Sequence, residues 1–205
     1  MILGSLFGAG RGRETIPIFP LHAVLYPGSL LPLRIFEVRY MEMAKTCLRD
    51  ATPFGVCMIR EGEEVGTPAV PENVGCMARI ADCDAAELGI LKVTAEGAGR
   101  FRILSTEVNK QGLIMGEVEA IAEDEAAPDA PGLEESAAFL RKAIAAIGPA
   151  RFREPLRFED ASWVAFRLAE ILPLRMDVKQ KLLELTDARL RLAILHKFLG
   201  QQGLL

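Results

Sequence analysis

The sequence predicts an α+β protein in which a strand-rich part with one inserted helix precedes a purely helical part. Short apolar or alternating runs separated by Gly and Pro turns fill the chain up to about residue 121. An acidic segment with two prolines, AEDEAAPDAPG, follows at residues 122–132. Beyond it, apolar residues recur at helical steps of three and four. These three observations predict a β-rich subdomain followed by a helical bundle.

Seven strands are expected in the first part. The Pro27-Gly28 pair separates the first two, because Pro presets the first central position of a type II turn and Gly tolerates the positive φ of the second. The run Gly97-Ala98-Gly99 is expected to form a further turn between two strands. The expected strands are residues 14–19, 30–36, 54–60, 74–82, 88–95, 99–106 and 113–121.

One helix is expected between the second and third strands, from Phe36 to about Asp50, because the residue before Pro53 is biased away from helical geometry. Its apolar stripe consists of Phe36, Tyr40, Met43, Ala44, Cys47 and Leu48. Residues 62–73 are rich in Glu, Gly and Pro and are expected to form an exposed loop.

The second part is expected to hold four helices. Two of them are residues 133–147 and 162–172. A third opens at Asp177, whose spacing to Gln180 suits a capping box. The last covers residues 187–199, with Leu190, Ala193, Ile194 and Phe198 as its apolar positions and His196 near its end. We therefore divide the chain into a flexible N-terminus (1–13), a β-rich subdomain (14–122), a linker (123–132) and a helical subdomain (133–205).

Charge and hydropathy count against nucleic acid and membranes as partners. The formal net charge of −4, from 28 acidic and 24 basic residues, provides no overall positive field to attract nucleic acid or anionic lipid. Residues 15–33 carry no charge, but their prolines break the backbone hydrogen bonding that a membrane-spanning helix needs. The four cysteines have no C-x-x-C spacing and are expected to be reduced, buried thiols of a cytoplasmic protein.

Motifs for catalysis, cofactors or metals are not found in the sequence. A P-loop needs a Gly-Lys pair, and the chain has none. His22 and His196 are its two histidines, and no G-x-S-x-G context surrounds a serine. The spacing of Cys76 and Cys83 does not suit zinc. We expect a protein that is not an enzyme and that needs no cofactor.

RNA binding is an alternative function. Six arginines could line a barrel face and contact phosphates: Arg34, Arg39, Arg60, Arg79, Arg100 and Arg102. Aromatic residues on which bases could stack do not alternate with them, so they are interpreted as ordinary outward-facing charges.

Residues 16–43, IPIFPLHAVLYPGSLLPLRIFEVRYMEM, resemble the signature that opens the N-terminal substrate-binding domain of ATP-dependent Lon proteases. The resemblance continues through VGCMARI at 74–80, GAGRFRI at 97–103 and the last helices, and it covers about residues 14–200. It implies a twisted β pseudo-barrel similar to PUA-like domains beside a helical bundle. Lon proteases continue into ATPase and Ser-Lys protease modules, whereas this chain ends at Leu205, so the resemblance implies a free-standing, non-catalytic module.

The resemblance also implies that the partner is unfolded polypeptide or a segment of a partner protein, with a separate ATPase or protease as a further possible partner. An edge strand and adjoining apolar grooves could accept such a segment. Leu25 and Tyr26, on the turn, are expected to be exposed apolar contacts. For Phe36 a place in the core of the first helix competes with a role in ligand contact. The candidate peptide-binding residues are Leu25, Tyr26, Pro27, Gly28 and Phe36.

Overall fold

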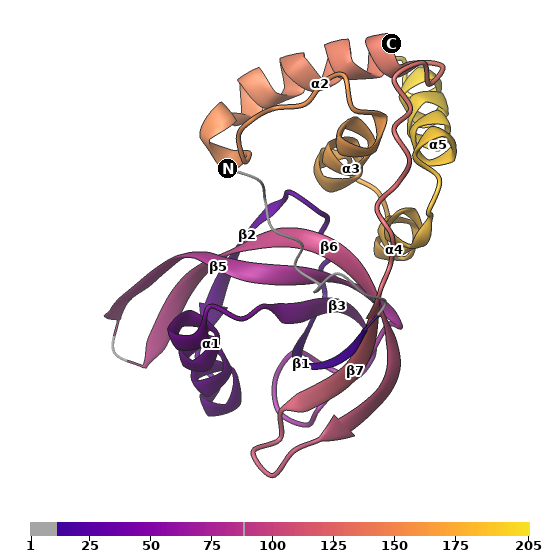
Figure 1. Ribbon diagram of the computed structural model, residues 1–205. Helices are drawn as coiled ribbons and strands as arrows, with labels where there is room; N and C mark the ends of the chain where they lie inside the picture. The colour runs from indigo at the N-terminus through magenta and orange to yellow at the C-terminus, as the bar shows by residue number, and fades with distance from the viewer. Residues whose placement is uncertain (1–11, 88) are drawn as a thin grey trace. The chain divides into compact units, whose positions relative to one another are not determined.

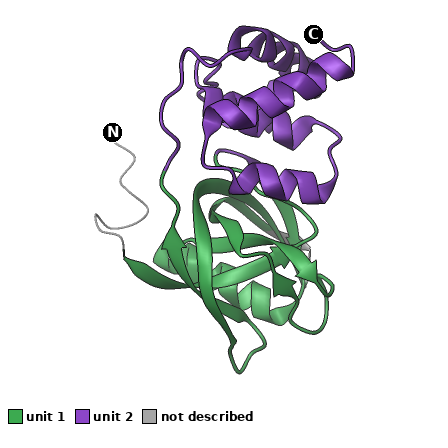
Figure 2. Cartoon of the chain, turned by 90° about the vertical axis from the view of Figure 1, so that its right-hand side faces the viewer, with its two compact units in different colours: residues 1–27, 31–122 green, residues 28–30, 123–205 purple. Residues whose placement is uncertain are grey.

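The computed structural model describes residues 12–87 and 89–205 (Figure 1). The flexible segment expected at residues 1–13 therefore lies almost wholly outside the described residues. The chain divides into two compact units, Met1–Pro27 with Leu31–Ala122 and Gly28–Leu30 with Glu123–Leu205 (Figure 2). Residues 28–30, which include the first residue of β2, thus belong to the second unit, although β1 and the rest of β2 belong to the first.

The first unit is a seven-stranded sheet that closes on itself. β1 pairs antiparallel with β7 on one side and parallel with β3 on the other, so the sheet curls into the barrel seen in Figure 1. The predicted α+β class with a twisted β pseudo-barrel is confirmed. The strands are β1 (Arg13–Leu21), β2 (Leu30–Ile35), β3 (Phe54–Glu61), β4 (Val70–Pro71), β5 (Val74–Glu87), β6 (Ile90–Val108) and β7 (Ile114–Ala120).

β6 is a single strand through Gly97 to Gly99, so the turn predicted there is wrong. Its register with β5 shifts at this point: Cys76 pairs with Arg100, while Ala78 pairs with Gly97, so β6 carries an extra residue. Such a β-bulge bends a strand without ending it. A Cβ on Gly97 would lie 2.1 Å from the carbonyl oxygen of Tyr26, so this glycine permits a close backbone approach instead of a chain reversal.

The inserted helix α1 (Val38–Asp50) packs one face on the barrel core. Tyr40, Met43 and Cys47 are buried, and the Tyr40 ring stacks on Phe19 with centroids 4.3 Å apart. The helix ends at Ala51, which adopts the left-handed conformation typical of a C-cap. At the other end Glu37 is the extended N-cap, so Phe36 lies before the helix and its predicted place on the apolar stripe is wrong.

The second unit contains α2 (Leu133–Ile147), a 3-10 turn η1 (Pro149–Arg151), α3 (Ala161–Ile171), α4 (Met176–Glu184) and α5 (Ala188–Gln201). Asp160 and Asp187 cap α3 and α5, because their carboxylates accept hydrogen bonds from backbone N–H groups of the first turns. The predicted capping box at Asp177 is wrong. Arg175 is the N-cap of α4, and its guanidinium pairs with the Asp177 carboxylate.

A buried ion pair forms part of the interior of the second unit. The side chains of Arg191 and Asp124 are 0% and 2% exposed, and their Nη1 and Oδ2 atoms lie 2.7 Å apart. The Ser162 hydroxyl donates to the same carboxylate at 2.5 Å. Residues 123–132, the expected linker, contain no helix or strand, and Asp124 anchors their first part within this unit. None of the described helices is long and apolar enough to cross a membrane.

Candidate functional site

The strongest candidate site is an apolar groove of about 320 Å³ on the first unit. It is formed by the end of β1, the strand β2, the start of α1 and the loop before β4. Its lining includes Phe19, Leu21, Ala23, Leu31, Pro32, Leu33, Arg34, Ile35, Phe36, Glu37, Tyr40, Glu64 and Val65. We refer to these residues as the β2 groove.

Two large apolar side chains in the β2 groove face solvent. Phe36 is 53% exposed and Val65 is 56% exposed. Beneath them the groove reaches the barrel core, because Phe19 and Tyr40, which line it, are buried and stacked on each other. Apolar surface of this kind gains free energy when a ligand removes it from water. The groove is therefore suited to apolar side chains of a partner.

One hydrogen bond and one ion-pair contact join the loop that carries Val65 to the loop that follows β1. The backbone N–H of His22 donates to Glu64 Oε1 at 2.6 Å, and His22 Nε2 lies 3.5 Å from Glu63 Oε2. These contacts join the loop that follows β1 to the loop that follows β3. Most of this second loop is exposed, as predicted, but Ala69 and Pro71 are buried where β4 pairs with β3.

The start of α1 is fixed by Arg39, which is buried. Its Nη2 lies 2.9 Å from Glu37 Oε2, its Nη1 donates to the carbonyl oxygen of Gly112 at 3.0 Å, and its guanidinium lies over the Tyr40 ring. Arg100 is also buried and donates to the carbonyl oxygen of Ala122. The prediction of outward-facing arginines is therefore wrong for Arg39 and Arg100, and neither is available to bind phosphate.

The structure places the sequence-predicted site residues in different environments. Leu25 and Tyr26 are buried, so the prediction that they are exposed contacts is wrong. Pro27 and Gly28 are half-buried, and Gly28 has the positive φ of 75° expected for the turn. Phe36 is the candidate that lines the β2 groove.

Sequence reasoning missed Leu31, Leu33 and Val65 as groove residues. The signal for Val65 was an isolated apolar side chain within a charged loop. The two leucines of β2 have no comparable signal. Alternating apolar residues in a strand are expected both for a face buried in the core and for a face that lines a surface groove.

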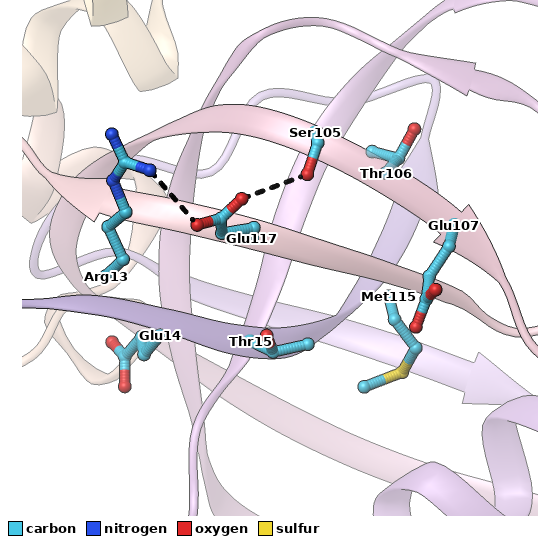
Figure 3. Close-up of a pocket in the computed structure, with 8 residues that line it drawn as sticks. All are labelled: Arg13, Glu14, Thr15, Ser105, Thr106, Glu107, Met115 and Glu117. Carbon is cyan, nitrogen blue, oxygen red and sulfur yellow. Dashed lines mark hydrogen bonds and ion pairs between the residues drawn. The ribbon is translucent and has the colours of Figure 1, made fainter.

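A second pocket of about 440 Å³ lies on the outer surface of β1, β6 and β7 (Figure 3). Its lining is polar apart from Met115, and its charges partly neutralise each other. Arg13 Nη1 lies 3.5 Å from Glu117 Oε1, and the Ser105 hydroxyl donates to Glu117 Oε2. Partial burial raises the pKa of Glu14. Among the described residues, no group of three or more His, Cys, Asp or Glu side chains could hold a metal ion.

The four cysteines are free thiols, as the sequence predicts for reduced residues. Cys47, Cys57 and Cys76 are buried, whereas Cys83 is half-buried. Burial raises the pKa of the Cys57 thiol far above its usual value, which disfavours the nucleophilic thiolate. This is the environment of a structural thiol.

The family described as the ATP-dependent protease La (LON) substrate-binding domain matches residues 15–201. The chain belongs to this family. The matched residues thus form a substrate-binding module, which is non-catalytic.

Two curated relatives are Lon proteases. This chain is 24% identical over 196 residues to the Lon protease of Anaeromyxobacter dehalogenans (strain 2CP-C), covering 91% of the chain and 23% of that protein. It is 24% identical over 198 residues to Lon protease 2 of Myxococcus xanthus, covering 92% of the chain and 24% of that protein. The chain therefore spans about a quarter of the length of these relatives.

Two solved structures have the same fold. A Lon N-terminal domain protein from Xanthomonas campestris is 34% identical, with a TM-score of 0.74 and coverage of 89% of this chain and 96% of that one. The N-terminal domain of the Mycobacterium avium complex Lon protease is 18% identical, with a TM-score of 0.69 and coverage of 91% and 98%. At 18% identity, the similarity to the Mycobacterium avium complex domain shows a shared fold alone.

Proposed function

We propose that this chain binds unfolded or extended polypeptide segments in the β2 groove. The observation that carries the proposal is the exposure of Phe36 and Val65, which come from two different loops and line one apolar groove. Membership of a substrate-binding family supports a binding role, and the groove supplies the chemistry. Apolar side chains of a client would enter the groove, and few specific polar contacts would restrict its sequence.

The backbone of β2 offers a second mode of contact. Within the described part of the chain, β6 is the one strand that pairs with β2, and a client segment would add along the other edge of β2. Pro32 lacks an N–H group, and proline within sheets is confined to edge positions of this kind. Pairing along a strand edge uses main-chain hydrogen bonds, which are the same for every client sequence.

Fluorescence anisotropy with a fluorescein-labelled, reduced and carboxymethylated lysozyme as the unfolded client tests the proposal. Burying the exposed half of one such side chain contributes about 1 kcal/mol, so Phe36→Ala and Val65→Ser should each weaken binding about fivefold. The double variant should weaken it about 30-fold if the effects add. Both side chains are exposed, so the fold should be retained.

Val108→Ser is the matched control, since Val108 is 55% exposed but does not line the β2 groove. It should bind the client as tightly as the unmodified chain does. Equal losses for Val65→Ser and Val108→Ser, or no loss for Phe36→Ala, would refute the groove as the binding site. A 20-nucleotide single-stranded RNA serves as the alternative ligand, and binding to it that weakens steeply with salt would favour nucleic acid.

A further inference from the structure

We propose that the second unit carries a docking surface for an acidic polypeptide segment, one with several consecutive Asp or Glu residues. The surface is formed by the C-terminal half of α2 and by η1, which follows it. Its cationic residues are Arg141, Lys142 and Arg151, all exposed, and we refer to them as the α2 cations. The surface lies within the second unit, so binding there does not require the β2 groove.

The α2 cations lie in a basic stretch of a chain that is acidic overall. Residues 136–153, between Glu135 and Glu154, contain four basic side chains and no acidic one, with Arg153 as the fourth. Among the described residues, no hydrogen bond or ion pair involves the side chains of the α2 cations. An exposed arginine elsewhere in this unit differs, since Arg189 pairs with Asp129. The α2 cations are thus available to carboxylates of a partner.

Arg141 is held in place without losing its hydrogen-bond donors. The Cζ atom of its guanidinium lies 4.4 Å from the centroid of the Phe158 ring. The Phe158 ring packs edge-to-face on Trp163, with centroids 5.4 Å apart, and Trp163 is buried in α3. A stacked guanidinium keeps the N–H groups at its rim free for bidentate binding of a carboxylate. Because the group is already oriented, less conformational entropy is lost when a partner binds.

The arrangement favours an extended acidic segment over a small anion or a nucleic acid. Arg141 is followed by six further residues of α2, about 9 Å of helix, before the chain reaches η1 and Arg151. A segment with several carboxylates can contact more of the α2 cations than a single anion can. Bases of single-stranded nucleic acid bind by stacking on aromatic rings, and the guanidinium of Arg141 already covers a face of Phe158.

Fluorescence anisotropy of the full chain with a fluorescein-labelled peptide of eight consecutive glutamates tests the surface. The unmodified chain should bind this peptide in about 50 mM salt, and about 0.5 M salt should weaken binding about tenfold because exposed charges are screened. Arg141→Gln and Arg151→Gln should each weaken binding about fourfold, and the double variant about 15-fold if the effects add. If Arg141→Gln alters the circular dichroism of the helices, Arg151→Gln alone decides.

Lys197→Gln is the matched control, because Lys197 is an exposed cation on α5 of the same unit. This variant should bind the glutamate peptide as tightly as the unmodified chain does, and so should Phe36→Ala, which alters the β2 groove. Failure of the β2 groove to bind its client is therefore a separate result.

Two kinds of result would overturn the inference. Absence of peptide binding in about 50 mM salt, or equal losses for Lys197→Gln and Arg141→Gln, would show that the α2 cations form no docking surface. Tighter binding of an eight-nucleotide single-stranded RNA than of the peptide, with the same dependence on Arg141, would show that the partner is a nucleic acid instead of an acidic polypeptide.

Discussion

Asp124→Asn is expected to destabilise the helical unit strongly, because it leaves the buried guanidinium of Arg191 without a countercharge. Nη1 of Arg191 lies 2.7 Å from Asp124 Oδ2, and both side chains are almost fully buried. Nε donates to the carbonyl oxygen of Leu182 at 2.9 Å, and Nη2 donates to that of Leu185. These carbonyl groups remain in the variant but carry no net charge.

Removing one partner of a buried ion pair costs about 3–5 kcal/mol, and the retained carbonyl contacts favour the lower end. With an m-value of about 1.5 kcal/mol/M in urea for a unit of this size, a loss of about 3 kcal/mol lowers the unfolding midpoint by about 2 M. Trp163 is the only tryptophan of the chain and lies in α3, so its fluorescence reports this unit specifically.

Asp129→Asn is the matched control. Asp129 comes from the same acidic segment and pairs with Arg189 on the same helix, but both side chains are largely exposed. An exposed pair of this kind contributes little, so the midpoint should not move measurably. Replacing both partners, as in Asp124→Asn with Arg191→Met, should recover part of the loss. If the urea unfolding midpoint of Asp124→Asn equals that of Asp129→Asn, the buried ion pair does not stabilise the helical unit as argued.

Three further predictions concern backbone and thiol positions. Gly97→Ala should destabilise the barrel by about 2–3 kcal/mol because its Cβ would overlap a backbone carbonyl, whereas Gly200→Ala, which meets no atom within 4 Å, should stabilise α5 by about 0.5 kcal/mol. Urea unfolding measures both, and equal effects would contradict the close approach. Ala51→Gly should raise stability by about 1 kcal/mol, because Ala51 has a φ of 53°; a lower melting temperature would count against this. Iodoacetamide at pH 8 should label Cys83 before Cys57, since burial raises the pKa of the Cys57 thiol and blocks access. Mass spectrometry showing early Cys57 labelling would contradict this.

Most of the fold could be predicted from local sequence patterns. α2 was predicted with the bounds observed, because an amphipathic run ends at Gly148-Pro149. The last helix was predicted to begin at Asp187, which is its N-cap, whereas the cap at Asp160 was not predicted, although it too depends on neighbouring residues. The error at Gly97 has a different origin. A glycine pair indicates a turn or a bulge equally well, and only the partner strand and the approach of a distant carbonyl decide between them.

The candidate site was much less predictable. Leu25 and Tyr26 follow a loop pattern that indicates exposure, yet both are buried. Phe36 continues a helical pattern, yet it precedes the helix and faces solvent in the β2 groove. Val65 lines that groove next to Glu64, which accepts a hydrogen bond from His22, 42 residues away in the chain. Exposure at such positions depends on segments distant in sequence, which periodicity does not report.

By itself, the sequence determined the family, the division into strands and helices, and the turn at Pro27-Gly28, because each depends on residues close together in the chain. Tertiary structure alone decided which faces are buried. In α5 the apolar Leu190 and Ile194 are exposed, while Arg191 is buried. The reason is that Asp124, 67 residues away, supplies the countercharge that makes burial of an arginine possible.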